Sequence, residues 1–124
     1  MAKILVADDD REIRELIVFT LRFAGHAVVS ATNGEEGCIL AKQNKPDLIL
    51  MDVSMPKMNG YEACKALKAD KETASIPVIF LSVRGQEAEV LAGLNAGGED
   101  YFLMPISSDR LTEKINLFLK KAGK

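Results

Sequence analysis

Three acidic residues stand at the ends of two apolar segments of the chain. Asp8 ends the segment KILVAD and is followed by Asp9, while Asp52 ends the segment DLILMD. Carboxylates that lie close together raise one another's pKa unless a cation lies among them. A site of carboxylate oxygens suits Mg²⁺ better than zinc, because Mg²⁺ prefers oxygen ligands and keeps several waters. If the two segments are neighbouring strands, the sequence therefore predicts a magnesium site at these acids.

A plainer interpretation is that Asp9 and Asp10 cap a helix and that Asp52 is a solvated loop residue. We accept this interpretation for Asp10, because Asp is a favoured residue at the N-cap position. Asp8 and Asp52, however, end segments whose other residues are mostly apolar. An uncompensated charge is costly in such a buried place, so we favour a functional role for both residues.

Two further strand ends bear on the same chemistry. Ser82 ends the segment PVIFLS, and its hydroxyl could hydrogen-bond an oxygen of a group attached to Asp52. Met104-Pro105 ends the weaker segment YFLM, where a second phosphate-binding side chain would be expected. A methionine side chain has no hydrogen-bond donor, so it cannot supply this contact.

The strand-length segments alternate with helical segments along the whole chain. They span residues 3–8, 27–32, 47–52, 77–82 and 101–104. Such alternation predicts a parallel sheet with helices on both faces, because right-handed crossovers place the helices there. We expect a single α/β domain over residues 1–124, a flavodoxin-like, doubly wound (βα)5 parallel sheet with strand order 2-1-3-4-5. In that order, ligands bind at the carboxyl ends of the first and third strands.

Capping patterns indicate where several helices begin. Asn33 with Glu36, and Asn59 with Glu62, have the spacing of a capping box, in which each side chain bonds the other residue's backbone N–H. Helices should therefore begin near residues 34 and 60. The last helix should begin at residue 107 or 108, where two serines precede an apolar stripe.

The composition excludes several classes of protein. Hydrophobic residues make up 48% and charged residues 27% of the 124 positions, which is typical of a globular domain. The formal net charge of −2 offers no basic surface, so direct binding of nucleic acid is not expected. No apolar segment has the length of a membrane span, and the start MAKILVADDD lacks the pattern of a signal peptide. We expect no association with a membrane.

The cysteines and the single histidine have ordinary explanations. Cys38 and Cys64 form no C-x-x-C pair, so we expect two small core residues in the reducing environment of the cytoplasm. His26 follows Gly25 in a predicted turn, far from the acidic strand ends. A surface position is the expected one for His26.

Several motifs together resemble the receiver domain of two-component response regulators. They are Asp8-Asp9 after an apolar strand, LMDVSMPKMNG at 50–60, FLS at 80–82 and AGGEDYFLMP at 96–105. The resemblance covers essentially the whole chain, and the motifs stand in the order that the family shows. It implies a signalling switch, which accepts a phosphoryl group and changes its surface, and not an enzyme with turnover.

The resemblance implies a role for each matching residue of the acidic site. Asp52 would be the phospho-acceptor. Asp9 and Asp52 would bind Mg²⁺ directly, Asp8 would bind it through water, and the backbone carbonyl of Ser54 would be the third protein ligand. Ser82 would be the switch hydroxyl, and Tyr101 the aromatic residue whose rotamer follows it.

The resemblance also implies partners. A histidine kinase or a phosphotransfer protein would donate the phosphoryl group, and an unknown output protein or fused domain would receive the signal. The surface of helix four, strand five and helix five would change, and a dimer through this surface is a further expectation.

Met104 departs from the family pattern, which nearly always has lysine at this position. Lys57 and Arg84, on loops that flank the site, could partly replace the missing charge. The bond between Met104 and Pro105 is predicted to be cis, because the resemblance places a cis X-Pro bond here and proline lowers the cost of the cis form.

Three alternatives bear on this interpretation; the first stays open, and the residues named argue against the other two. An atypical receiver that binds partners without phosphorylation is favoured by the missing lysine. A phosphatase of the aspartyl-phosphate type would need a second acid two residues after the nucleophile, where this chain has Ser54. A carrier of FMN would need a glycine- or hydroxyl-rich phosphate loop after the first strand, where this chain has the acidic sequence DDDRE.

Overall fold

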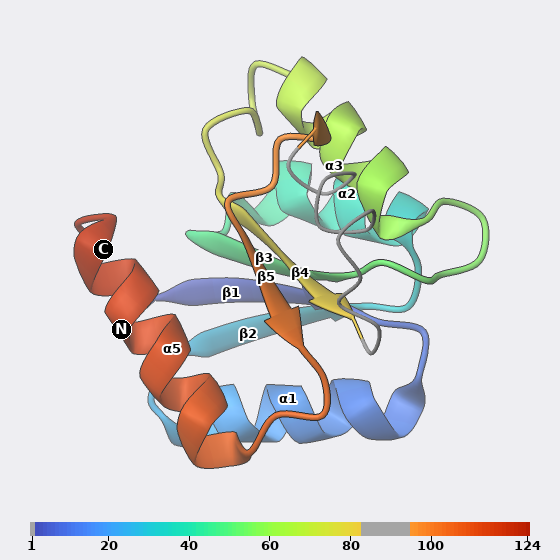
Figure 1. The fold of residues 1–124 in the computed structure, drawn as a ribbon. Coiled ribbons are helices and arrows are strands. Elements are labelled where there is room, and N and C mark those ends of the chain that lie inside the picture. Colours follow the sequence, from blue (N-terminus) through green and yellow to red (C-terminus); the bar gives the residue numbers. More distant parts are fainter. Residues whose placement is uncertain (1, 83–94) are drawn as a thin grey trace.

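The computed structural model describes residues 2–82 and 95–124, in which five parallel strands form one sheet (Figure 1). The strands are β1 (Lys3–Ala7), β2 (Ala27–Ala31), β3 (Leu48–Asp52), β4 (Val78–Ser82) and β5 (Asp100–Leu103). Their order across the sheet is β2-β1-β3-β4-β5. The predicted fold class and strand order are therefore confirmed.

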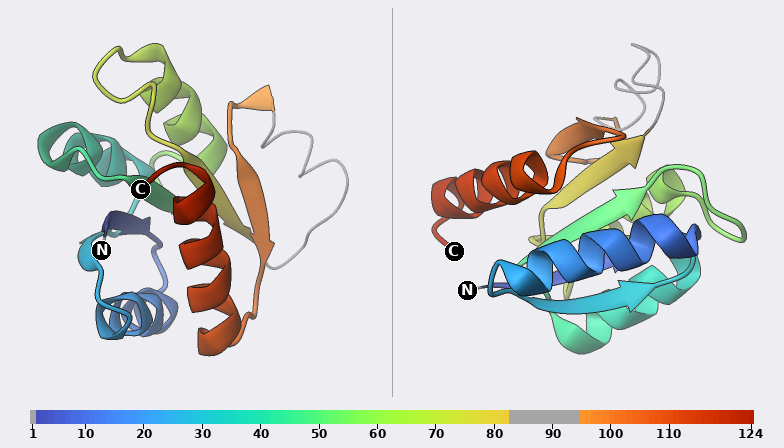
Figure 2. Two further views of the ribbon diagram at one scale, coloured as in Figure 1. Left: turned by 90° about the vertical axis from the view of Figure 1, so that its left-hand side faces the viewer. Right: turned by 90° about the horizontal axis from the view of Figure 1, so that it is seen from below.

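Helices cover both faces of the sheet. They are α1 (Arg11–Phe23), α2 (Gly34–Asn44), α3 (Gly60–Ala69) and α5 (Ser108–Lys121). Helices α1 and α5 lie on one face, and α2 and α3 lie on the other, as the views in Figures 1 and 2 show. The helix expected between β4 and β5 falls mostly on residues 83–94, outside the described part of the chain.

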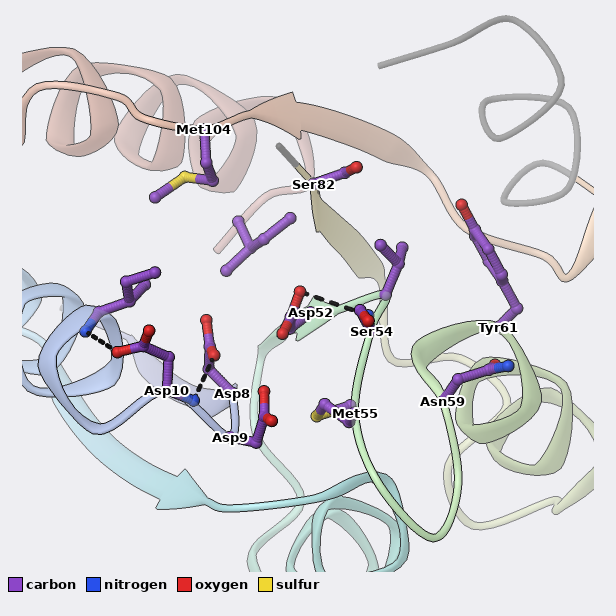
Figure 3. A pocket seen from close by; sticks show the side chains of 13 residues that line it. Asp8, Asp9, Asp10, Asp52, Ser54, Met55, Asn59, Tyr61, Ser82 and Met104 are labelled. Carbon is purple, nitrogen blue, oxygen red and sulfur yellow. Dashed lines mark hydrogen bonds between the residues drawn. The ribbon is translucent and has the colours of Figure 1, made fainter. Parts of the chain in front are cut away.

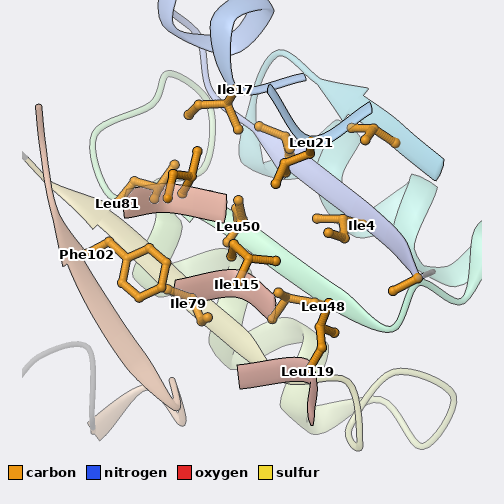
Figure 4. Close-up of a cluster of buried hydrophobic side chains, with 14 residues drawn as sticks. Ile4, Ile17, Leu21, Leu48, Leu50, Ile79, Leu81, Phe102, Ile115 and Leu119 are labelled. Atoms are coloured by element: carbon orange, nitrogen blue, oxygen red, sulfur yellow. The ribbon is translucent and has the colours of Figure 1, made fainter. Parts of the chain in front are cut away.

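Alternate residues of each strand point to opposite faces, so each apolar strand contributes to two cores. In the core under α1 and α5, Ile4, Leu50 and Ile79 of the strands meet Ile17 and Ile115 of the helices (Figure 4). Each of these five side chains is at most 2% exposed. Full burial of one such side chain stabilises the fold by about 1.5–3 kcal/mol, which explains why strands with two apolar faces occupy the centre of the sheet.

The predicted helix starts are confirmed, with one correction in detail. Asn59 and Glu62 form a complete capping box at α3. At α2 the Asn33 side chain accepts a hydrogen bond from the Glu36 N–H as predicted, at 2.8 Å. The Glu36 carboxylate, however, accepts from the N–H of Thr32 at 2.7 Å, one residue before the expected partner. The prediction of a reciprocal capping box at α2 was therefore wrong, although Asn33 still caps the helix.

His26 is buried, so the expected surface position was wrong. The side chain is 9% exposed, and its Nδ1 atom accepts a hydrogen bond from the N–H of Ala2 at 3.1 Å. Its Nε2 atom lies 2.9 Å from Oδ1 of Asn116 on α5. Because Nδ1 accepts, Nε2 carries the proton and donates to Asn116. The neutral ring thus joins the start of β1 to α5, at the end of the sheet opposite the acidic residues.

Two glycines of α2 should respond in opposite ways to alanine. A Cβ atom on Gly34 would lie 2.2 Å from the backbone oxygen of Met58, whereas the nearest atom to a Cβ on Gly37 is Cβ of Ala7 at 3.5 Å. We expect Gly34→Ala to lower the free energy of unfolding by about 1–3 kcal/mol, because backbone must move. Gly37→Ala should leave it unchanged or raise it by up to about 1 kcal/mol, since alanine favours helix. Urea denaturation measures both, and equal losses would contradict the steric argument.

Candidate metal centre

The register of the parallel strands brings the carboxyl ends of β1 and β3 to the same edge of the sheet. Ala7 is paired with Met51, so the chain leaves the two strands side by side at Asp8 and Asp52. One carboxylate oxygen from each of Asp8, Asp9 and Asp52 lies within 4.8 Å of the others (Figure 3). The three acids therefore converge as the strand order predicts.

The acids line an open pocket of about 670 Å³. Asp8 is buried, with 3% of its side chain exposed, Asp52 is half-buried and Asp9 is exposed. Oδ1 of Asp8 accepts a hydrogen bond from the N–H of Asp10 at 2.9 Å, which fixes the orientation of its carboxylate. The pocket thus combines a rigid buried acid with two more accessible ones.

No resident cation balances these carboxylates in the described part of the chain. None of the ion pairs formed within residues 2–82 and 95–124 involves Asp8, Asp9 or Asp52. The nearby Arg14 donates from Nη1 to the backbone oxygen of Asp8 at 2.9 Å, and not to its carboxylate. The negative charge of the pocket is therefore available to an added cation.

Burial and mutual repulsion raise the pKa of two of the acids. Burial raises the pKa of Asp8, the hydrogen bond from Asp10 opposes the rise, and the charge of Asp9 adds to it. Burial, followed by the charge of Asp8, raises the pKa of Asp52 from 3.8 to about 7. The ionised forms are therefore unfavourable in the metal-free protein, and a cation among the acids would remove this penalty.

Asp10 has the structural role that the sequence predicts. Its side chain accepts a hydrogen bond from the N–H of Ile13 at 3.1 Å and caps α1. Asp10 also lines the pocket, but it is not among the acids whose oxygens converge within 4.8 Å. Asp10 therefore caps α1, whereas its neighbour Asp9 converges with Asp8 and Asp52.

Ser54 and Ser82 both line the pocket near the Asp52 carboxylate. The N–H of Ser54 donates to Oδ1 of Asp52 at 3.4 Å, so the loop after β3 folds back over the acid. Ser82 ends β4 and is 3% exposed. In Figure 3 its hydroxyl points away from the Asp52 carboxylate. The structure thus places Ser82 at the pocket with its hydroxyl turned away from the Asp52 carboxylate.

Met104 lines the pocket on the side opposite the loop of Ser54 (Figure 3). Its N–H donates to the backbone oxygen of Ser82 at 2.7 Å, which carries the sheet pairing one residue beyond β5. Its side chain packs against the core under α1 and α5, together with Ile13. The bond between Met104 and Pro105 is cis, as predicted.

The residues considered as substitutes for the missing lysine have different positions. Lys57 is exposed, has a positive φ of 66° and does not line the pocket. Arg84 lies outside the described residues. Met104 is therefore the residue that occupies the side of the pocket toward β5.

Tyr61, which the sequence motifs did not single out, lines the same pocket from the first turn of α3. Its hydroxyl lies 3.2 Å from the hydroxyl of Tyr101 on β5. A tyrosine directly after the helix-opening glycine Gly60 was the available signal. Its direction, however, depends on how α3 packs against the sheet.

A family model described as the response regulator receiver domain matches residues 4–116. The chain belongs to this family. The sequence resemblance to receiver domains is thereby confirmed. The matched residues include the acidic pocket at the ends of β1 and β3.

Relatives and solved structures agree with this assignment. Protein PilH of Pseudomonas aeruginosa is 40% identical over 119 residues, which cover 96% of this receiver domain and 98% of PilH. The DNA-binding dual master transcriptional regulator RpaA of Synechocystis is 35% identical, and the match covers 100% of this chain but 52% of RpaA. A structure of the chemotaxis protein CheY4 of Vibrio cholerae has a TM-score of 0.90 at 29% identity, over 94% of this chain and 98% of that one.

The relatives differ in length. This chain spans nearly all of PilH but about half of RpaA and of the regulator PhoB of Pseudomonas aeruginosa. None of the helices formed by residues 2–82 and 95–124 is long and apolar enough to cross a membrane.

The donor set of this receiver domain fits Mg²⁺. Receiver domains bind Mg²⁺ at an acidic pocket, and the converging atoms of Asp8, Asp9 and Asp52 are all carboxylate oxygens. Such hard oxygen donors without sulfur or imidazole suit Mg²⁺. The raised pKa of Asp52 gives a second reason, because burial and then the charge of Asp8 disfavour its ionised form, and a divalent cation would offset both effects.

Asp52→Asn should stabilise the metal-free receiver domain. The folded protein holds the Asp52 proton more tightly than the unfolded chain does, because the pKa rises from 3.8 to about 7. The stability of the parent should therefore fall as the pH rises from about 4 to 7. At pH 7 the variant should gain roughly 1–3 kcal/mol, after allowance for solvent screening.

Urea denaturation in the presence of a chelator, repeated across this pH range, measures the difference in the free energy of unfolding between the variant and the parent. The asparagine side chain can still accept the bond from Ser54, so the comparison isolates the charge. The gain should shrink as the pH falls toward 4 and approach zero below about pH 3, where the carboxyl is protonated in both the folded and the unfolded state. A gain that stayed constant across the range would contradict the assignment to Asp52.

Proposed function

We propose that this receiver domain accepts a phosphoryl group on Asp52 from a phosphohistidine of a histidine kinase or a phosphotransfer protein. The observation that carries the proposal is the convergence of Asp8, Asp9 and Asp52 in one open pocket. Asp52 ends a buried strand and still faces that pocket, so its carboxylate is held firmly and is open to a donor. The domain itself would supply the groups that the transfer needs.

In the proposed step a carboxylate oxygen of Asp52 forms a bond to phosphorus while the bond from phosphorus to the donor imidazole nitrogen breaks. The donor imidazole, which is protonated on its other ring nitrogen in the phosphohistidine, leaves with the electron pair of that bond as a neutral ring. The product is an aspartyl phosphate. Because the transition state is largely a matter of charge and position, the protein contributes mainly by placing Asp52 and its neighbours.

Four groups of the chain would serve the metal ion. Asp9, Asp52 and the backbone carbonyl of Ser54 would hold Mg²⁺ directly, and Asp8 would hold it through water. When bound, Mg²⁺ supplies positive charge that offsets the negative charge of the phosphoryl oxygens. The convergence of the three carboxylates and the folding of the Ser54 N–H onto Asp52 support this arrangement.

Ser82 and Tyr101 would convert the modification into a change of surface. A rotation about χ1 would turn the Ser82 hydroxyl, which points away from Asp52 in Figure 3, toward a phosphoryl oxygen. Tyr101 would follow on β5, and the surface of helix four, β5 and α5 would change for a partner. Leu103 on β5 and Leu117 on α5 support a contact surface there, since they are 55% and 53% exposed. A second copy of the chain is one partner that this surface would suit.

The setting of the domain is part of the proposal. We place residues 1–124 as one receiver domain in the cytoplasm, and the two free cysteines, Cys38 and Cys64, support a reducing compartment. The signal would pass to an output protein or to a fused domain. The net charge of −2 supports the absence of direct nucleic-acid binding by the receiver domain itself.

One observation favours a second function, in which the domain binds partners without phosphorylation. Met104 fills the position of the family lysine and packs into an apolar wall with Ile13. A pocket without that ammonium group lacks one charge-assisted bond to a phosphoryl group. The retention of the three converging acids favours the phosphorylated function over this alternative.

Incubation with a small acyl phosphate decides between the two functions. With Mg²⁺ present we expect the intact mass to rise by one phosphoryl group, mapped to the peptide that contains Asp52. A chelator should prevent the rise, because the metal offsets the repulsion between the phosphoryl group and the acids. If neither an acyl phosphate nor a phosphohistidine donor raises the mass in Mg²⁺, the proposal fails and the alternative stands.

The adjacent acids Asp9 and Asp10 should differ in their effect on Mg²⁺ binding. Asp9→Ala removes one of the converging carboxylates, so we expect Mg²⁺ affinity to fall by about tenfold or more. Asp10→Ala should remove chiefly the cap of α1, which costs about 1 kcal/mol of stability. Calorimetric titration with Mg²⁺ compares the two variants, which have the same net charge. Equal losses of affinity would contradict the assignment of Asp9, and not Asp10, to the metal site.

A further inference from the structure

Three aromatic residues connect α3, β4 and β5 on the face of the sheet that α2 and α3 cover. Phe80 of β4 is 1% exposed and is paired in register with Tyr101 of β5. The ring centroids of Tyr61 and Phe80 are 5.1 Å apart at an interplanar angle of 62°, and those of Phe80 and Tyr101 are 6.1 Å apart at 51°. The hydroxyl oxygens of Tyr61 and Tyr101 lie 3.2 Å apart. Tyr61 therefore holds Tyr101 by a hydrogen bond while both rings pack on Phe80.

The backbone next to Tyr61 is tied to the phospho-acceptor. The N–H of Gly60 donates to the backbone oxygen of Val53 at 3.1 Å. Gly60 also packs closely against the backbone of Asp52, because a Cβ atom on Gly60 would lie 2.3 Å from the backbone oxygen of Asp52. The first turn of α3 therefore cannot keep its place if the backbone at Asp52 and Val53 moves.

Tyr61 also lines the pocket in which a phosphoryl group on Asp52 would lie, and in Figure 3 its side chain rises from α3 at the far side of that pocket from Asp9. A connected path thus runs from the backbone of Asp52 through Gly60 to the side chain of Tyr61 and on to Tyr101. It begins at the end of β3, where the acceptor lies, and does not pass through Ser82.

We propose that Tyr61 is the positioning residue for Tyr101: its hydroxyl holds Tyr101 against Phe80 in the resting domain and links that position to the Asp52 loop. This inference rests on the proposed function, and it takes phosphorylation of Asp52 as the event that shifts the loop directly after β3. A movement of the loop changes the distance between the two hydroxyls, and hydrogen bonds weaken steeply as their geometry departs from the optimum. Phosphorylation would thereby release Tyr101 from α3, a population shift between two positions of one side chain.

The composition of the chain allows a direct test. Tyr61 and Tyr101 are its two tyrosines, and it has no tryptophan. In protein prepared with ¹³C-labelled tyrosine rings, the Tyr61→Phe variant contains one tyrosine, so its tyrosine signal belongs to Tyr101. The Tyr101→Phe variant identifies the signal of Tyr61 in the same way. Phenylalanine at residue 61 keeps the ring on Phe80 and removes only the hydroxyl.

In the metal-free Tyr61→Phe variant we expect the Tyr101 signal to move toward the position of a solvent-exposed tyrosine. One hydrogen bond corresponds to about a fivefold change in population, so the population of released Tyr101 should rise about fivefold. The further movement of this signal on phosphorylation should be smaller than in the parent. Intact mass, recorded on the samples phosphorylated in Mg²⁺, should show that the phosphoryl group is present in parent and variant when their signals are compared.

A matched control separates positioning from a general loss of stability. Thr20→Val removes a hydroxyl that donates to the backbone oxygen of Leu16 at 2.8 Å, on the opposite face of the sheet. This variant should leave the Tyr101 signal where the parent has it, although it also loses a hydrogen bond. If Tyr61→Phe leaves the resting Tyr101 signal unchanged, or if Thr20→Val moves it equally, the role of Tyr61 is wrong.

The outcome for Tyr61 is distinct from the outcome for the proposed function. If the parent takes up no phosphoryl group, the proposed function fails, and the resting comparison of the Tyr101 signal still supports or overturns the positioning role. If Asp52 is phosphorylated and the Tyr101 signal moves equally far in parent and variant, the function stands and the link through Tyr61 is overturned.

Discussion

Asp52→Asn should take up no measurable phosphoryl group from an acyl phosphate in Mg²⁺, whereas the parent should gain one. The reaction needs an anionic oxygen that can form a bond to phosphorus, and the amide of asparagine is a poor nucleophile. Asp8 does not replace it, because its carboxylate is buried and its Oδ1 atom already accepts the N–H of Asp10. Asp9 lies at the exposed edge of the cluster, without the support of a strand.

Asp10→Asn is the matched control for this loss. It makes the same chemical change at a residue that lines the same pocket. Asparagine also caps helices well, so α1 should keep its start. The control should therefore be labelled at about the rate of the parent. A mass gain in Asp52→Asn equal to that of the parent would show that another residue is the acceptor.

Met104→Lys should speed phosphorylation and weaken Mg²⁺ binding in the same protein. Met104 lines the pocket, so a lysine ammonium there would lie among the acids and near a phosphoryl group on Asp52. One charge-assisted hydrogen bond is worth about 1.5–3 kcal/mol, so the labelling rate should rise by about tenfold or more. Before phosphorylation the ammonium competes with the metal ion, and Mg²⁺ affinity should fall by about three- to tenfold.

The lysine should also have a cost in the fold. Met104 packs against the core under α1 and α5, and a lysine would keep the methylene contacts while directing its charge into the pocket. We expect the free energy of unfolding to fall by about 1 kcal/mol or less. Met104→Leu is the control, since it stays apolar and should change neither the labelling rate nor Mg²⁺ binding. If Met104→Lys likewise changed neither quantity, another cation would already serve the site.

The sheet and its acids could be predicted because short-range patterns in the chain encode them. Apolar segments that alternate with helical stripes imply parallel pairing with crossovers, and this pairing leaves few possible strand orders. Once the order is known, a residue that ends a strand must lie at the carboxyl edge of the sheet. Asp8 and Asp52 therefore converge for reasons that are visible in the sequence. The cap at Asp10 is equally local, because its partner Ile13 is three residues away.

Only the tertiary structure decided which partners the remaining polar side chains have. Tyr61 meets Tyr101 across 40 positions of the chain, and His26 meets Asn116 across 90. The Glu36 carboxylate accepts a hydrogen bond from the N–H of Thr32 and not from that of Asn33, and capping rules do not resolve this difference of one residue. Each choice depends on where a helix settles against the sheet. That position results from the packing of many apolar side chains at once, so no local pattern of residues specifies it.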